Sequence, residues 1–155
     1  MARRPFLHHI FCFLLLAACM LLSCTGHSQN LAGTSSDGQI AFIEGSWPEA
    51  VRQARAQHKY IFMDTYATWC GPCTLMKETT FKNKKAATFF NEHFINLSVD
   101  IEKGIGPELA SRLGIQAIPT LIIFDENGKP VSGTMGYMGA KKLIRFGEQA
   151  LGKHP

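Results

Sequence analysis

The chain has 155 residues, of which 46% are hydrophobic, and a chain of this length and composition can bury one sizeable core. Its formal charge of +4 includes Arg3 and Arg4, which lie in a segment that we expect to be removed. Without these two residues, 14 basic and 12 acidic side chains leave a net charge of +2. Such a small excess gives no support for nucleic-acid binding, and we expect none.

Residues 1–23 have the pattern of a signal peptide, with a basic start, an apolar stretch at 10–22, and small and polar residues at its end. The apolar stretch is short for a membrane span, which needs ~20 residues. Its end, "LLSC" at 21–24, resembles the lipobox of bacterial lipoproteins, in which cleavage before the cysteine lets it carry lipid. We therefore expect lipidation of Cys24 and a membrane-anchored protein of the bacterial periplasm. "LAAC" at 16–19 also fits the lipobox, and an ordinary secretory signal is the further alternative.

Residues 24–39 are polar and rich in glycine and serine without a period of 2 or 3.6, so we expect a flexible tether. Strand-like and helix-like segments alternate after it. In chain order, we expect a strand at 40–43, a helix from Ser46, a strand at 60–66, a helix from the cysteine motif to about Thr79, a helix at 84–94, a strand at 95–100, a helix at 107–113, a strand at 119–124, a turn at 125–130, a strand at 131–135 and a helix at 140–151.

Local signals support two of these elements. Ser46 and Glu49 have the spacing of a capping box at the start of the first helix. Trp47, Ala50, Val51, Ala54 and His58 recur at spacings that share one helical face, and we expect His58 to lie on the helix surface. The segment at 60–66 is apolar nearly throughout, as is typical of a central strand that is covered on both faces.

Export leaves one cysteine pair to the folded domain. Cleavage of the signal removes Cys12 and Cys19, and lipidation occupies Cys24, so Cys70 and Cys73 can pair only with each other. A bridge between them closes a very small loop, for which chain entropy assigns little stabilisation. A purely structural disulfide is therefore a weak interpretation, and a redox catalyst or part of a metal site remain.

The order of the elements, with "WCGPC" at 69–73 after a central strand, resembles the thioredoxin superfamily over residues 40 to 152. The resemblance implies an α/β fold with a central mixed β-sheet flanked by helices on both faces, occupying residues 40–155. "AIPT" at 117–120 matches the position of the family's cis proline, and Asp64 matches its buried acid. The stretch at 46–64 is similar to extracytoplasmic thioredoxin-like domains that receive electrons across bacterial membranes.

The cysteine motif suits thiol-disulfide exchange. Free N–H groups and the macrodipole at a helix N-terminus stabilise a thiolate, so we expect Cys70 to be the nucleophile with a lowered pKa. Cys73 lies on the same helical face and less exposed, where it can resolve the mixed disulfide. Gly71 and Pro72 permit this geometry, because proline in the first turn loses only an N–H without a helical partner.

The remaining site residues follow mainly from the resemblance. Asp64 is expected to take the proton of Cys73, because burial raises a carboxyl pKa towards the working pH, and a structural acid is the alternative. Cytosolic thioredoxins have a lysine near this acid, whereas this chain has Asn96, which makes relay through such a partner doubtful. Trp69 is expected either to shield the cysteines at the rim of the site or to be a core aromatic.

Client binding is expected beside the cysteines. Pro119 in the cis form presents the backbone of Ile118 to an extended substrate, which can dock by strand-like hydrogen bonds. Gly136 matches a glycine that lets partner chains approach closely. With Trp69, Gly71 and Pro72, these residues form the expected client-binding site.

We expect an extracytoplasmic thiol-disulfide oxidoreductase, and specifically a protein disulfide reductase, because the Gly-Pro dipeptide and the neighbouring acid resemble reducing members of the family. An oxidase or isomerase is the alternative. A Cu(I) carrier is a lesser one, since Cu(I) accepts two thiolates, whereas zinc needs four ligands. We expect no dissociable cofactor and no metal. The expected partners are disulfide-containing client proteins and an upstream thiol donor, which a membrane protein could supply, and we expect a monomer.

Overall fold

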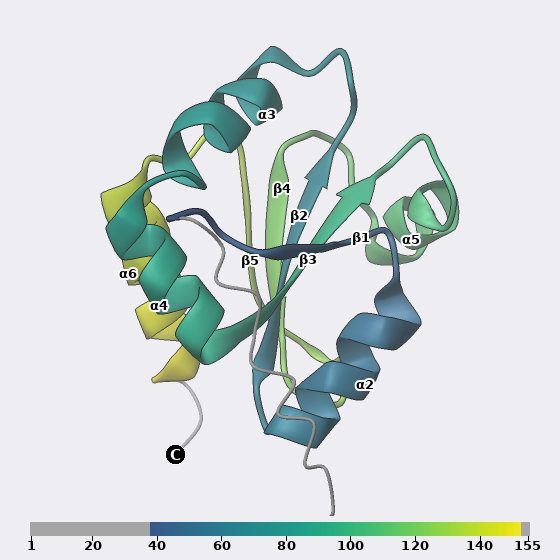
Figure 1. The fold of residues 1–155 in the computed structure, drawn as a ribbon. Coiled ribbons are helices and arrows are strands. Elements are labelled where there is room, and N and C mark those ends of the chain that lie inside the picture. The colour runs from purple at the N-terminus through teal and green to yellow at the C-terminus, as the bar shows by residue number, and fades with distance from the viewer. Residues whose placement is uncertain (1–37, 153–155) are drawn as a thin grey trace, which may run out of the picture. The chain divides into compact units, whose positions relative to one another are not determined.

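The fold is built on a five-stranded sheet with the strand order β1-β3-β2-β4-β5 (Figure 1). The computed structural model describes residues 38–152, so the predicted signal peptide, Cys24 and nearly all of the tether lie outside the described residues. The strands are β1 (Phe42–Glu44), β2 (Tyr60–Tyr66), β3 (Phe94–Asp100), β4 (Thr120–Phe124) and β5 (Pro130–Met135). Strands β1, β3 and β2 are parallel, whereas β4 runs antiparallel to β2 and β5 antiparallel to β4. The predicted mixed sheet is therefore confirmed.

Helices cover both faces of the sheet, as predicted (Figure 1). They are α2 (Trp47–Gln57), α3 (Gly71–Leu75), the π-helical turn η1 (Met76–Thr80), α4 (Lys84–His93), α5 (Gly106–Leu113) and α6 (Ala140–Leu151). The alternation of side chains along β2 divides the core, because Phe62 packs with residues of α4 and α6, whereas Ile61 and Met63 pack with residues of α2 and α5. All three side chains are fully buried, which explains why this strand is apolar nearly throughout.

The first helix begins where predicted, but its predicted cap is wrong. Ser46 is the N-cap residue, yet its side chain makes no capping hydrogen bond. The carboxylate of Glu49 instead accepts hydrogen bonds from Arg52 and Gln53 further along the helix, so it does not reach back to Ser46. His58 is exposed, as predicted, and is the C-cap residue in the left-handed conformation, with φ of 51°.

The helix after the cysteine motif is not uniform. The prediction of one helix to about Thr79 is replaced by five α-helical residues in α3 and a π-helical turn in η1. The hydroxyl of Thr79 donates to the carbonyl of Leu75 at 2.6 Å, and the N–H of Phe81 reaches the carbonyl of Met76 at 2.9 Å. A side-chain hydroxyl competes here with the backbone for a helical carbonyl, which widens the turn.

The other boundaries agree closely with the prediction. Strand β2 and helix α6 have the predicted bounds, and β3, α5, β4 and β5 begin within one residue of them. The first strand is displaced, since β1 pairs with β3 only from Phe42 to Glu44. Ile40 is buried but belongs to the preceding segment, where its N–H donates to the carbonyl of Phe81. No helix in the described part of the chain is long and apolar enough to cross a membrane.

Candidate active site

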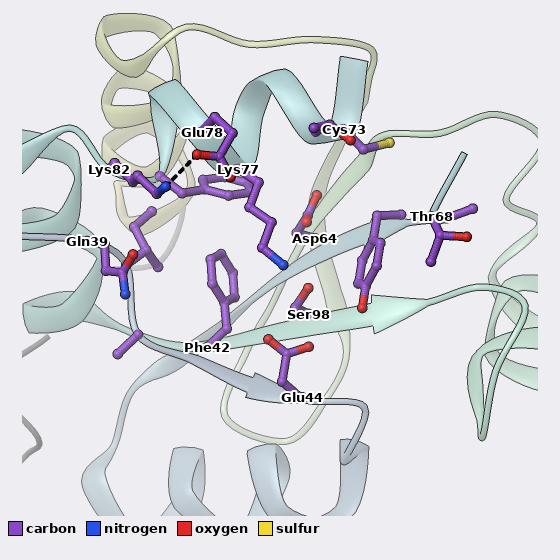
Figure 2. Close-up of a pocket in the computed structure, with 16 residues that line it drawn as sticks. Gln39, Phe42, Glu44, Asp64, Thr68, Cys73, Lys77, Glu78, Lys82 and Ser98 are labelled. Carbon is purple, nitrogen blue, oxygen red and sulfur yellow. Dashed lines mark hydrogen bonds and ion pairs between the residues drawn. The ribbon is translucent and has the colours of Figure 1, made fainter. Parts of the chain in front are cut away.

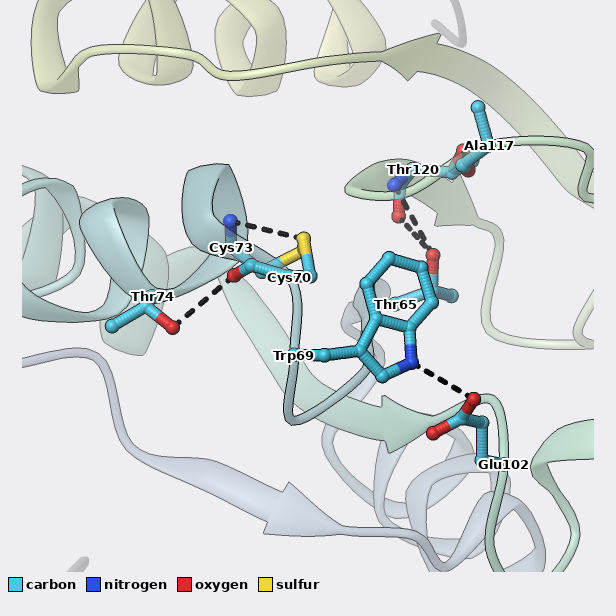
Figure 3. The surroundings of a disulfide bond; sticks show 8 residues. All are labelled: Thr65, Trp69, Cys70, Cys73, Thr74, Glu102, Ala117 and Thr120. Carbon is cyan, nitrogen blue, oxygen red and sulfur yellow. Dashed lines mark hydrogen bonds between the residues drawn. A yellow bond between two sulfur atoms is a disulfide. The ribbon is translucent and has the colours of Figure 1, made fainter.

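Cys70 and Cys73 form a disulfide at the start of α3, directly after the loop that follows β2 (Figure 3). Their Cα atoms are 5.3 Å apart. Cys70 is the N-cap residue with an extended backbone, and its sulfur accepts a hydrogen bond from the N–H of Cys73 at 3.2 Å. Gly71 and Pro72 complete the first turn, and the N–H of Cys73, which has no helical partner, faces the Cys70 sulfur. This arrangement favours negative charge on that sulfur in the reduced protein.

Both cysteines are buried, with exposed fractions of 3% for Cys70 and 5% for Cys73. The prediction that Cys73 is the less exposed of the two is therefore wrong. Cys73, unlike Cys70, lines a cavity that it shares with Asp64, which the spacing of the motif could not reveal.

Trp69 lies at the rim of the site and is 68% exposed, which excludes the alternative of a core aromatic. Its indole N–H donates to the carboxylate of Glu102 at 2.9 Å (Figure 3). Glu102 follows β3 in the chain, and its own N–H is held by the carboxylate of Asp100 at 3.0 Å. Glu102 could not be predicted as a site residue, because an acid in a loop 33 residues away carries no local signal of this contact.

The loop with the cis Ile118–Pro119 peptide bond is anchored to β2 by hydroxyl groups. The hydroxyl of Thr65 donates to the carbonyl of Thr120 at 2.9 Å and accepts from the N–H of Thr120 at 3.1 Å (Figure 3). The hydroxyl of Thr120 donates to the carbonyl of Ala117 at 2.6 Å. Pro119 is buried and Ile118 is half-buried. Thr65 and Thr120 were not predicted as site residues, because in the sequence they cannot be told from ordinary threonines of a strand.

Gly136 lies beside this loop at the end of β5. Its N–H donates to the carbonyl of Pro119 at 2.7 Å, and its φ of +90° is one that glycine adopts without strain. A Cβ atom placed on Gly136 would meet nothing within 4 Å, so the space beside it is open. The structure thus brings Gly136, Pro119 and Thr65 together from β5, the cis-proline loop and β2.

Asp64 is buried in β2, with an exposed fraction of 5%. Burial raises the pKa of its carboxyl from 3.8 to about 7, with a further contribution from the negative charge of Glu44 and an opposing one from Lys77. Its Oδ1 atom has no hydrogen-bond partner within the described residues. Asp64 pairs in register with Ser98 of β3.

Asn96, which stands where cytosolic thioredoxins have a lysine near the buried acid, makes its amide hydrogen bonds away from Asp64. Its amide group donates to the carbonyls of Ala41 and Phe90 and to the side chain of Asn91. These contacts direct the amide towards β1 and α4, and no hydrogen bond between Asn96 and Asp64 is present in the described region.

Asp64 and Cys73 both line a cavity of about 890 Å³ (Figure 2). Cys73 and Asp64 line it together with Glu44 from β1, Tyr66 from β2 and Lys77 from η1. Outside this cavity, four large apolar side chains are exposed in the described structure: Trp69, Leu75, Met135 and Tyr137. Residues 38–152 bring together no group of three or more His, Cys, Asp or Glu side chains that could hold a metal ion.

A mixed sheet with a helix-capping disulfide, a buried acid behind it and a cis-proline loop beside it defines a protein of the thioredoxin fold with a dithiol-disulfide site. Residues 47–151 match the family model described as a thioredoxin-like domain, and the chain belongs to this family.

Comparison with known proteins gives relatives of several kinds. The solution structure of a protein from Bacteroides thetaiotaomicron, provisionally named a disulphide-isomerase, is 37% identical and superimposes with a TM-score of 0.67 over 76% of this chain and 98% of that one. Thioredoxin Y1 from the chloroplast of Arabidopsis thaliana is 35% identical over 97 residues, which are 63% of this chain and 53% of its own length. The thiol:disulfide interchange protein DsbD of Tatumella citrea is 30% identical over 59% of this chain and 16% of its own. The chain spans about half the length of the chloroplast thioredoxins that it matches.

Proposed function

We propose that the protein is a thiol-disulfide oxidoreductase that reduces disulfides of client proteins through a mixed-disulfide intermediate. The observation that carries this proposal is the Cys70–Cys73 disulfide, whose Cys70 sulfur caps a helix while Cys73 shares a cavity with Asp64. The two sulfurs therefore have different surroundings. The Cys70 sulfur is suited to attack on a disulfide, and the Cys73 sulfur has a proton acceptor, Asp64, in the same cavity. Membership of the thioredoxin-like family and the names of the relatives support the same chemistry.

In the first step, the Cys70 thiolate attacks one sulfur of a client disulfide and the other client sulfur leaves as a thiolate. In the second step, Cys73 transfers its proton to the Asp64 carboxylate, and its sulfur attacks the Cys70 sulfur of the mixed disulfide. The second client sulfur then leaves as a thiolate, and the two electrons of the dithiol have passed to the client. An upstream thiol donor re-reduces the Cys70–Cys73 disulfide, and no dissociable cofactor is needed.

The client docks in an extended conformation beside the disulfide. The backbone of Ile118 offers strand-like hydrogen bonds, and the open space at Gly136 lets the client chain approach. Trp69, exposed and held by Glu102, forms the rim with Gly71 and Pro72, and an apolar client side chain can lie against its indole.

Variants of the two cysteines test the assignment of roles. Cys70→Ser should abolish the reduction of insulin disulfides, whereas Cys73→Ser should trap mixed disulfides with clients, because attack and resolution belong to different sulfurs. Trapped adducts are read by non-reducing electrophoresis and mass spectrometry, with the double variant as the control. Equal loss of activity in both variants without any adduct would contradict the assigned roles.

An isomerase is the function that competes with a reductase for this protein. The Gly-Pro dipeptide favours a reductase, whereas the provisional name of the relative from Bacteroides thetaiotaomicron favours an isomerase. Equilibration with glutathione redox buffers distinguishes them, because each difference of ~30 mV in potential changes the equilibrium constant tenfold for a two-electron couple. A reductase should have a midpoint near that of thioredoxin, ~−270 mV, and an isomerase one nearer ~−180 mV.

We also propose that the protein acts outside the cytoplasm, in the bacterial periplasm, as a lipoprotein anchored through Cys24. The sequence pattern of residues 1–24 supports this location. Cys24→Ser should move the protein from the membrane fraction to the soluble fraction while its far-ultraviolet circular dichroism stays the same. Unchanged fractionation of this variant would refute the anchor without bearing on the redox chemistry.

A further inference from the structure

The cavity behind the disulfide contains more charge than the exchange chemistry requires. Asp64 and Cys73 lie at its inner wall, and Glu44 and Lys77 approach the same space from β1 and η1 (Figure 2). In Figure 2, the Lys77 side chain descends from the helix above and its amine points towards the space between Asp64, Ser98 and Glu44. A cation from η1 and an anion from β1 therefore share this cavity with the buried acid.

The other charged groups of this cavity neutralise each other. Lys82 and Glu78 form an ion pair four residues apart, and both are exposed. The remaining titratable group on the wall is Tyr66 of β2, whose hydroxyl has a raised pKa, first because of burial and then because of the nearby negative charges. Among the described residues, the ion pairs within 4 Å include neither Lys77 nor Glu44. Neither charge is held in a close ion pair within residues 38–152, and both act on Asp64, while Lys77 also acts on Glu78.

Their effects on Asp64 have opposite signs. The ammonium group of Lys77 stabilises the ionised carboxylate, and the carboxylate of Glu44 destabilises it, which is why Lys77 lowers and Glu44 raises the pKa of Asp64. Low dielectric around a buried acid strengthens both interactions relative to water. The family's lysine position is occupied by Asn96, whose amide is engaged with Ala41 and Asn91, so this cation comes from a different element.

We propose that Lys77 and Glu44 are positioning residues that act from opposite walls of this cavity to set when Asp64 can accept the proton of Cys73. The proposal rests on the function proposed above for Asp64 and Cys73. The proton passes from the Cys73 sulfur to an Asp64 oxygen and leaves through the cavity to water when the carboxyl ionises again. Lys77 favours loss of this proton from Asp64, which restores the carboxylate that accepts the next one. Glu44 disfavours the same ionisation.

Direct titration of Asp64 tests the proposal in the oxidised protein, where the cysteines do not titrate. The carboxyl carbon of Asp64 is followed by NMR against pH in protein labelled with carbon-13 aspartate, and the signal is assigned by its loss in Asp64→Asn. The midpoint should rise in Lys77→Met and fall in Glu44→Gln. Each change should be smaller than the ~1–3 pH units caused by a charge in direct contact, and should shrink in high salt.

Two further variants separate electrostatics from structure. Lys77→Arg keeps the charge and should restore the midpoint towards that of the wild type. The double variant Lys82→Met, Glu78→Gln removes a paired cation and anion from the same cavity and leaves its net charge unchanged, so the midpoint of Asp64 should not move. Lys77 and Glu44 are both exposed, so their replacement leaves the core intact.

The resolving step supplies the second readout. When the reduced protein reacts with a client disulfide, the pH dependence of client release from the mixed disulfide should move in the same direction as the NMR midpoint in each variant. Midpoints in Lys77→Met and Glu44→Gln that equal the wild-type value would overturn this inference, whatever the activity. A wild-type protein that fails to reduce disulfides, although its Asp64 midpoint responds to both variants, would overturn the proposed function alone.

Discussion

Replacement of Asp64 by asparagine should stabilise the folded protein at neutral and alkaline pH. The carboxyl is 95% buried and its Oδ1 atom has no hydrogen-bond partner in the described structure. Ionisation of such a group requires desolvation of a charge without full compensation, and this cost falls on the folded state alone. Asparagine has nearly the same shape and never ionises, so it removes the cost.

The size of the effect follows from the two pKa values. Asp64 has a pKa of about 7 in the folded protein and an ordinary value of 3.8 when the chain is unfolded. Well below pH 3.8 Asp64 is protonated in both the folded and the unfolded protein, so it does not make the free energy of unfolding depend on pH. Between pH 3.8 and 7 the unfolded chain loses the proton first, so the free energy of unfolding falls as the pH rises. At about 1.4 kcal/mol per pKa unit, the total loss above pH 8 is about 4 kcal/mol.

Urea unfolding of the oxidised protein at pH 4, 5.5, 7 and 8.5 measures this difference. The oxidised form is used because a titrating Cys73 thiol would couple to Asp64. The advantage of Asp64→Asn over the wild type should grow from near zero at pH 4 to a few kcal/mol at pH 8.5. Glu92→Gln, which removes an exposed carboxyl, is the matched control and should show no such growth. A stability difference for Asp64→Asn that is the same at every pH would refute the reasoning.

Three further substitutions test local features of the structure by their urea midpoints. Thr65→Val should lower the free energy of unfolding by about 1–3 kcal/mol, because it leaves the buried N–H of Thr120 without its acceptor, and Thr65→Ser should restore most of the loss. Gly136→Ala should cost about 1–3 kcal/mol through backbone strain at a φ of +90°, although its Cβ meets no atom within 4 Å, and an unchanged midpoint would contradict this. Gly147→Ala should also destabilise, by about 1–3 kcal/mol, because the new methyl group would lie 2.6 Å from the ring of Phe89, whereas helix propensity alone would make the variant more stable.

Much of the fold follows from local patterns in the sequence. The continuous apolar run at 60–66 indicated a strand that is buried on both faces, and β2 has those bounds. Glycine, proline and polar residues at 125–130 marked the turn between β4 and β5. The capping box at Ser46 failed because Glu49 has competing partners one turn ahead, which a spacing rule does not weigh.

The resemblance to the thioredoxin superfamily pointed to Asp64 as the candidate acid. The sequence by itself determined the cysteine motif and the order of the strands and helices along the chain. These features depend on residues close together in the chain, where the period of the side chains and the turn-forming residues act directly. Only the tertiary structure decided which distant groups surround that chemistry: Glu102 beside Trp69, Thr120 on Thr65, and Lys77 and Glu44 around Asp64. Such contacts join residues that are far apart in the chain. These residues meet only because the strands pair in one register and the helices pack on the two faces of the sheet.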